Sequence, residues 1–381
     1  MFDLYSGNTP SRLNKEHFKG TVNWISSGEL KEHYIYSSKE QISEEAAKSL
    51  KLLPVGTFVI AIYGLEAEGV RGTGSITQEP STISQACMSF IPKGVIENEF
   101  LYSWYKKHGN VIGIRYAQGT KQQNLSYDIL GKFRIAYPNT KEQEKLNKFI
   151  SLLDERIATQ NKIIDKLQTL IKGMEDNLLD NPLWEKTYLR SFMQFFPTNS
   201  LSWEQLSYKE GAIRNLHYGL IHGLQTRGIN SVSLPMIKNE AIPKQYTLCQ
   251  VGDVAFADAS EDTGEIAKSV EFVDTIEGDT ICGLHTIHGR DIKNRTVVGF
   301  KGFAFNSRYF HNQIKRLAQG TKVFSITANN LSSCYVYLPD LETQKAIVNL
   351  LKTYEAKLLV SKRLLEHYEK QKQYLLRQMF I

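Results

Sequence analysis

One segment of this sequence occurs twice, and the repeat limits the folds open to the chain. Arg115–Gln143 reads RYAQGTKQQNLSYDILGKFRIAYPNTKEQ, and Arg316–Gln344 reads RLAQGTKVFSITANNLSSCYVYLPDLETQ. Matching residues, such as Pro138 and Pro339, lie 201 positions apart throughout the segment. A constant offset over this length indicates a duplicated unit, so we expect one structural plan built twice.

A heptad pattern follows each copy. After Pro138 and again after Pro339, apolar residues alternate spacings of four and three, which is typical of the a/d seam of a coiled coil. The first seam is predicted at Leu146, Ile150, Leu153, Ile157, Gln160, Ile164, Leu167 and Ile171, and the second at Ile347, Leu351, Tyr354, Leu358, Ser361, Leu365, Tyr368 and Leu375. Each residue of the second seam lies 201 positions after a seam position of the first helix.

Both seams carry a polar residue near the middle, Gln160 in the first and Ser361 in the second. In an antiparallel pair these two residues would face one another, and a polar layer fixes register at some cost in stability. We therefore predict that the helices pair with each other, although a stripe of this kind can also pack on a globular domain. At 1.5 Å per residue, a helix of about 38 residues extends roughly 57 Å.

The remaining sequence reads as mixed strand and helix, which predicts an α/β (mixed α+β) fold with two similar domains. The predicted boundaries are 1–138 for the first domain, 139–182 for its helix, 183–339 for the second domain and 340–381 for the last helix. Apolar strands are expected in Leu52–Gly64 and Leu248–Ser260, each followed by a polar loop. Each domain should end in a strand, Ile129–Pro138 or Leu331–Pro339, before Asn139 or Asp340 caps the helix.

One difference between the copies concerns their beginnings. The second domain opens with WEKTYLRSF, Trp184–Phe192, which reads as a first strand. The first domain opens with MFDLYSG and has no counterpart for most of that segment. We expect the first domain either to lack this strand or to start late.

Composition is that of an ordinary globular protein. The 381 residues are 41% hydrophobic and 23% charged, and the net charge of +6 is too small to identify a nucleic-acid binder by itself. The four cysteines form no CxxC pair, which argues against a disulfide framework or a zinc ribbon. With no secretory signal at the amino terminus and no long apolar run, a cytoplasmic location and no contact with a membrane are expected.

Motifs for catalysis are weak throughout the sequence. NPLW at Asn181–Trp184 lacks the second proline of an adenine-methyltransferase motif, and the glycines of GVRGTGSIT do not have cofactor-binding spacing. GIRYAQGTK departs from a nucleotide-binding loop, because one extra residue separates its glycines and Thr precedes Lys. CGLHTIH, Cys282–His288, could supply metal ligands, but it aligns with the strand-like QACMSFIP of the first copy. The sequence therefore predicts no catalytic residue, no metal site and no cofactor in this chain.

Basic and amide side chains in loops are the remaining candidates for function. Arg and Lys contact phosphates or guanine, and Gln can read adenine in the major groove. The candidate DNA-binding residues are Arg71, Thr73, Arg115, Lys121, Gln122, Gln123, Lys268, Arg316 and Lys322. For each one, a solvated surface position is the alternative interpretation.

The duplicated QGTK segments, the proline and Glu-Gln or Thr-Gln junctions, and the opening GNTPSRLNKEHFKGTVNWISSGEL together resemble the DNA-specificity subunit of type I restriction–modification systems. The resemblance covers nearly the whole chain. It implies two target-recognition domains that each read half of a bipartite site on double-stranded DNA, held apart by antiparallel helices. Two domains on one rod can reach two major-groove sites, and the helix length bounds their separation at about 17 base pairs.

The resemblance also implies partners. Two modification (methyltransferase) subunits would bind the helices and restriction subunits would join them, so S-adenosylmethionine, ATP and Mg would belong to the partners. A structural adaptor whose domains bind something other than DNA is the main alternative. A self-contained restriction or methylation enzyme is a third, and it would need activity from this chain alone.

Overall fold

The structure, a computed structural model, describes residues 1–224, 227–229, 234–274, 276 and 278–380. Contacts divide the chain into a first unit, Met1–Asn161 with Leu364–Ile381, and a second unit, Lys162–Arg363. The two long helices are α4 (Thr140–Leu179) and α9 (Leu341–Met379). Each unit therefore contains a globular body and one end of both long helices.

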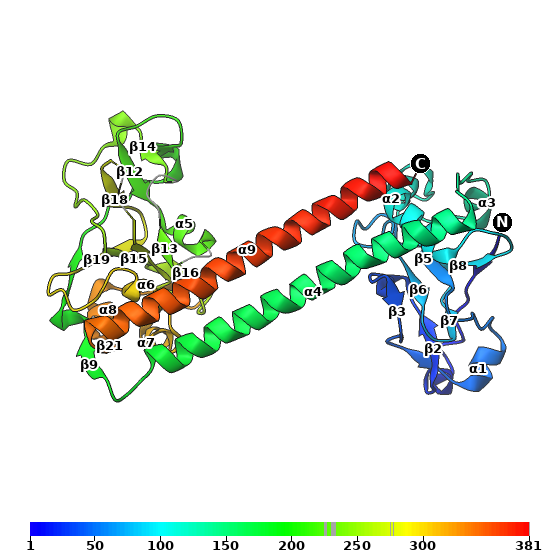
Figure 1. Ribbon diagram of the computed structural model, residues 1–381, viewed down its shortest axis with the longest axis horizontal. Helices are drawn as coiled ribbons and strands as arrows, with labels where there is room; N and C mark the ends of the chain where they lie inside the picture. The colour runs from blue at the N-terminus through cyan, green and yellow to red at the C-terminus, as the bar shows by residue number, and fades with distance from the viewer. Residues whose placement is uncertain (225–226, 230–233, 275, 277, 381) are drawn as a thin grey trace. The chain divides into compact units, whose positions relative to one another are not determined.

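The first unit is built on a five-stranded sheet of order β1-β8-β5-β6-β3, with a three-stranded sheet of order β4-β2-β7 (Figure 1). Its strands are β1 (Phe2–Ser6), β2 (Val22–Ile25), β3 (Tyr34–Ile35), β4 (Gln41–Ile42), β5 (Phe58–Ala61), β6 (Gly74–Thr77), β7 (Ser81–Ile83) and β8 (Cys87–Pro92). Its shorter helices are α1 (Glu44–Lys48), α2 (Asn98–Tyr116) and α3 (Tyr127–Leu130), with 3-10 turns at Lys15–Phe18 and Ser27–Glu29.

The second unit has a five-stranded sheet of order β10-β19-β15-β17-β13 and a four-stranded sheet of order β11-β14-β12-β18 (Figure 1). Its strands are β9 (Glu185–Tyr188), β10 (Met193–Phe196), β11 (Leu206–Ser207), β12 (Ile213–Leu216), β13 (Gly228–Ile229), β14 (Met236–Ile237), β15 (Val254–Ala257), β16 (Ala259–Ser260), β17 (Ser269–Phe272), β18 (Thr280–Cys282), β19 (Thr286–Asp291), β20 (Phe324–Ser325) and β21 (Tyr335–Leu338). Its shorter helices are α5 (Tyr218–Gly223), α6 (Phe300–Ala304), α7 (Arg308–Leu317) and α8 (Ala328–Ser333), with 3-10 turns at Leu189–Ser191, Trp203–Gln205 and Asn239–Ala241.

The two units share one topology. In both five-stranded sheets the strand that begins the unit's sheet pairs antiparallel with the last one, β1 with β8 and β10 with β19. At the other edge the pairing is parallel, β3 with β6 and β13 with β17. The predicted mixed α/β fold with two similar domains is therefore confirmed, and it matches the duplication in sequence.

The central strand of each sheet is buried on both faces. Side chains alternate along a strand, so Phe58 and Ile60 join the core under α2 whereas Val59 and Ala61 join a core on the opposite face. In β15, Val254 and Phe256 likewise join one core, whereas Ala255 and Ala257 join another on the opposite face. A continuous apolar run is the pattern expected of a strand covered on both sides.

The long helices begin where proline ends the preceding segment. The Asn139 side chain accepts a hydrogen bond from the Glu142 amide at 3.1 Å, and the Asp340 side chain accepts one from the Thr343 amide at 2.9 Å. These bonds satisfy amides that a helix start leaves without an internal partner. Among the described residues, no helix combines the length and apolar character needed to cross a lipid bilayer.

Within each unit the two long helices run antiparallel. In the first unit Ile150, near the start of α4, shares a core with Phe380 beyond the end of α9. In the second unit Leu179, at the end of α4, shares a core with Ile347 near the start of α9. The predicted antiparallel arrangement of the helices is confirmed.

The strand predicted over Ile129–Pro138 is wrong. Tyr127–Leu130 forms α3, and residues 131–139 have no regular structure in the first unit. The corresponding β21 is a strand because it pairs with β9, the segment Glu185–Tyr188. No described segment of the first unit pairs with residues 131–138 in the way that β9 pairs with β21. The backbone of these residues therefore lacks the hydrogen-bonding partner that a strand needs.

Candidate functional site

Each unit presents the Gly-Thr-Lys sequence in a tight turn. Gln118 and Asn124 close the first turn with backbone hydrogen bonds of 2.8 and 2.9 Å, and Gln319 and Ser325 close the second with 3.0 and 2.8 Å. Gly119 has a φ of +122°, where a Cβ would lie 2.1 Å from the Gln122 carbonyl oxygen. Gly320 repeats this geometry, with a φ of +129°. Only glycine fits such a position without strain.

Both turns are anchored to the loop that follows the central strand. In the first unit the Leu125 amide donates to the Ile62 carbonyl at 2.9 Å, and the Leu65 amide donates to the Gln123 carbonyl at 3.2 Å. In the second unit the Ile326 amide donates to the Asp258 carbonyl at 3.0 Å. The fold thus holds each turn near the carboxyl-terminal end of the central strand of its sheet.

Two predicted binding residues of the first unit brace this loop. Arg71 donates from Nε to the Leu65 carbonyl at 2.9 Å and from Nη2 to the Glu66 carbonyl at 3.1 Å. The amide of Gln123 donates to a Glu66 carboxylate oxygen at 2.9 Å. The structure therefore brings Arg71 and Gln123 to one loop, where their backbone and guanidinium groups hold its shape. Nearby, the Thr73 hydroxyl donates to the Val70 carbonyl at 2.7 Å.

Lys268 has a similar bracing position in the second unit. Its ammonium group donates to the His222 carbonyl at 3.0 Å and pairs with Glu265 at 2.9 Å. Only 19% of its side chain is exposed. Two of the three ammonium protons are thus committed to protein partners, and contact of Lys268 with DNA stays a prediction.

The other predicted binding residues lie at the surface. Arg115 at the end of α2 is exposed, as is Arg316 at the corresponding place in α7. Lys121 and Lys322, in the two turns, are also exposed. Gln122 is exposed and the neighbouring Gln123 is half-buried. These side chains offer cationic and amide groups to a polyanion, and their contact with DNA stays a prediction.

The sequence reasoning missed a pair of glutamines that fasten the long helices to the globular bodies. The Gln143 amide nitrogen donates to the carbonyls of Val95 at 3.0 Å and Pro138 at 2.9 Å, and its oxygen accepts from the Glu97 amide at 2.9 Å. The side chain is fully buried.

Gln344 repeats all three bonds in the second unit. It donates to the carbonyls of Arg295 at 3.0 Å and Pro339 at 2.9 Å, and it accepts from the Val297 amide at 3.0 Å. The offset of 201 linked the two glutamines in the sequence. The recurrence of glutamine at the same place in both copies was the available signal.

The predicted seam residues lie on the covered faces of the helices. Each of the sixteen is buried or half-buried, and Ile150, Leu153, Ile164, Ile171, Ile347 and Leu351 are the most covered apolar members. Gln160 is buried in the first unit and Ser361 is half-buried in the second. That these two polar residues face each other stays a prediction.

A polar network in the first unit joins both helices to the globular body. Asp154 of α4 contacts Lys372 of α9 and lies 3.8 Å from Nδ1 of His33, whose Nε2 is 2.9 Å from Glu99. The His33 ring stacks on Tyr102 with 3.9 Å between centroids. Burial disfavours the charged imidazole, but hydrogen bonds with Asp154 and Glu99 outweigh it and raise the His33 pKa above its usual value.

Comparison with protein families identifies this architecture. A family model for the type I restriction modification DNA specificity domain matches residues 1–169 and 283–369. The type I restriction enzyme MjaIX specificity subunit of Methanocaldococcus jannaschii is 30% identical over 174 residues, 43% of this chain and 39% of that protein. The EcoR124I/EcoR124II specificity subunit of Escherichia coli is 30% identical over 168 residues, 43% of this chain and 40% of that protein. The matches thus span about two fifths of these relatives.

Solved structures share the fold over the full chain. The type I restriction–modification S subunit from M. genitalium superimposes with a TM-score of 0.57 at 15% identity, covering 100% of this chain and 94% of that one. The HsdS subunit from Thermoanaerobacter tengcongensis gives a TM-score of 0.50 at 13% identity, covering 100% and 96%. The resemblance inferred from the repeated segments is confirmed. Because the family model covers more than half of its residues, the chain belongs to the family of type I restriction–modification DNA specificity domains.

Proposed function

We propose that this chain is a non-catalytic specificity subunit that reads a two-part target on double-stranded DNA, one part with each unit. The observation that carries the proposal is the pair of Gly-Thr-Lys turns. Both turns have the same closing hydrogen bonds, a glycine with positive φ and an equivalent anchoring bond, but their exposed side chains differ. A common scaffold with different surface groups is what two readers of different half-sites require.

The turns differ in the chemistry they offer to a base. The first presents Lys121 and Gln122, whose ammonium and amide groups suit phosphate and adenine. The second presents Lys322 and Val323, and the Val323 side chain is 53% exposed. An exposed aliphatic group can contact the methyl group of thymine. Each lysine would contact a phosphate in its own half-site. The neighbouring residues, Gln122 and Val323, would give the two half-sites different sequence preferences.

The long helices offer surfaces for the modification subunits. Phe149 of α4 is 41% exposed and Leu350 of α9 is 42% exposed, and the two residues are 201 positions apart. Ile163 and Leu364, another pair with this offset, are 41% and 38% exposed. Exposed apolar groups that recur on both helices suit two copies of one partner. Methyl transfer and cleavage, with S-adenosylmethionine, ATP and Mg, would then belong to the modification and restriction subunits.

The proposal is tested by changing one turn at a time. The assembled complex with Lys121→Ala and Gln122→Ala is compared with a matched complex carrying Lys322→Ala and Val323→Ala, using footprinting and selection of bound sequences from a random pool. We expect each pair to relax base preference in one half of a split site and to leave the other half unchanged.

Three results would contradict the proposal. If both double variants changed base preference equally in both halves, the turns would not be the elements that read the sequence. A single uninterrupted target would contradict the two-part site. A correctly assembled complex that fails to bind DNA would instead support an adaptor with non-DNA partners.

A further inference from the structure

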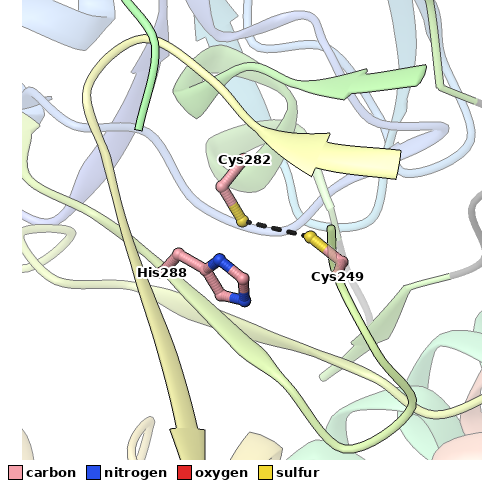
Figure 2. A group of neighbouring side chains, drawn as sticks. All are labelled: Cys249, Cys282 and His288. Atoms are coloured by element: carbon pink, nitrogen blue, oxygen red, sulfur yellow. Dashed lines mark hydrogen bonds between the residues drawn. The ribbon is translucent and has the colours of Figure 1, made fainter. Parts of the chain in front are cut away.

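Two cysteines and a histidine that are distant in sequence meet inside the second unit. The sulfur atoms of Cys249 and Cys282 lie 3.6 Å apart. One ligand atom each from Cys249, Cys282 and His288 all lie within 4.8 Å of one another. Figure 2 shows the imidazole of His288 next to the two sulfurs, with one ring nitrogen turned toward them. All three side chains are buried, with exposed fractions of 7%, 2% and 1%.

The fold brings the three residues from separate elements. Cys249 precedes β15, and its amide donates to the Thr280 carbonyl at 2.8 Å. Cys282 ends β18 in the four-stranded sheet, and His288 lies in β19 of the five-stranded sheet. His285, the other histidine of the CGLHTIH segment, points elsewhere and bonds to Asp258 at 3.1 Å. The cluster therefore marks the junction of two sheets.

Groups around His288 fix its ring in an orientation suited to metal binding. Its Nε2 lies 2.7 Å from Oδ2 of Asp253, so Nδ1 is the nitrogen left to face the sulfurs. Asp253 is itself held by Arg290, with bonds of 2.8 and 2.7 Å, and by the Gln250 amide at 2.8 Å. A carboxylate that orients the distal nitrogen of a histidine is the usual support of a zinc ligand.

The first unit shows that the fold itself does not require this cluster. Strand register places Leu53 at the position of Cys249, Ile83 at that of Cys282 and Ser89 at that of His288. Leu53 and Ile83 are buried in one apolar core. The second unit thus has three potential ligands where its duplicate has two aliphatic side chains and a serine.

We propose that Cys249, Cys282 and His288 bind a zinc ion, with water as the fourth ligand. Two thiolates and one imidazole are a common ligand set for zinc. The charges balance, because the ion would neutralise two thiolates while Arg290 neutralises Asp253. Zinc binds cysteine in its thiolate form, so binding would release the protons of both thiols. The bound ion would tie β18 to β19 and to the segment before β15.

The test measures metal in the purified full-length chain after expression with added zinc. We expect one zinc ion per chain by elemental mass spectrometry. After exchange with cobalt, we expect thiolate-to-cobalt absorption in the near ultraviolet and tetrahedral bands in the visible. Cys249→Leu with Cys282→Ile, the residues of the first unit, should remove both signals while circular dichroism stays that of a folded chain. Cys334→Ala removes a buried cysteine outside the cluster and should retain the metal.

A second variant tests the supporting carboxylate. Asp253→Asn keeps all three ligands, and loss of the supporting charge should weaken zinc affinity by about 10- to 100-fold in a chelator competition. The proposal is overturned if folded wild-type chain carries no zinc and gives no cobalt spectrum. It is also overturned if the double cysteine variant keeps the metal, or if freshly isolated chain contains a Cys249–Cys282 disulfide.

Discussion

Replacing Gln143 by leucine should loosen the attachment of α4 in the first unit and leave the second unit unchanged. Leucine has nearly the volume of glutamine but makes none of its three hydrogen bonds, at 3.0, 2.9 and 2.9 Å. At about 1 kcal/mol for each buried neutral bond, the variant should lose about 3 kcal/mol. The loss includes two carbonyls and one amide left without their partner in a buried place.

Amide hydrogen exchange reads this effect directly, because the Glu97 amide donates to Gln143 and the Val297 amide donates to Gln344. In Gln143→Leu the Glu97 amide should exchange on the order of a hundredfold faster, since each 1.4 kcal/mol is a factor of ten. In Gln344→Leu the Val297 amide should respond instead. Gln122→Leu, at an exposed position, is the control and should change neither. Unchanged exchange at Glu97, or equal acceleration at both amides, would refute the reasoning.

Three further outcomes follow from charges and exposed groups. Lys301 and Glu271 form a fully buried ion pair at 3.0 Å. Lys301→Met alone should therefore destabilise the second unit by about 3–5 kcal/mol in denaturant titration, and adding Glu271→Met should recover most of that loss. If the second substitution recovered no stability, the two side chains would not act as an ion pair. Burial raises the pKa of Glu355 from 4.5 to about 7, so its contribution to the free energy of unfolding should fall as pH rises from 4.5 to 7. Glu355→Gln should remove that slope, and an unchanged slope would exclude this residue as its source. In Phe149→Glu and in Leu350→Glu, the mass of the complex measured by light scattering should correspond to one modification subunit fewer. Full assembly of both variants would exclude these sites.

The long helices could be predicted from the sequence because their signal is local and occurs twice. The heptads after Pro138 and Pro339 specify a covered face, and the 201-residue offset links the two helices. Antiparallel pairing was predicted from Gln160 and Ser361, the polar residues near the middle of the two seams. Local periodicity and duplication were sufficient for this part of the fold.

Features that depend on partners distant in sequence could not be predicted. Residues 131–138 resemble β21 in sequence, but a strand forms only where β9 supplies the hydrogen bonds. Arg71 and Lys268 read as free cations, whereas the structure ties both to backbone carbonyls. Cys249 lies 33 residues from Cys282, and only the strand register brings their sulfurs together. Spacing along the chain carries no information about such contacts.

The most direct test of the central claim is a map of methylated bases in DNA from cells that express this chain with its modification subunits. We predict methylation within a target of two short specified segments separated by unspecified base pairs. Exchanging the globular body of one unit for that of a related chain should change one segment and preserve the other. Methylation within a single uninterrupted sequence, or a change in both segments, would contradict reading by two separate units.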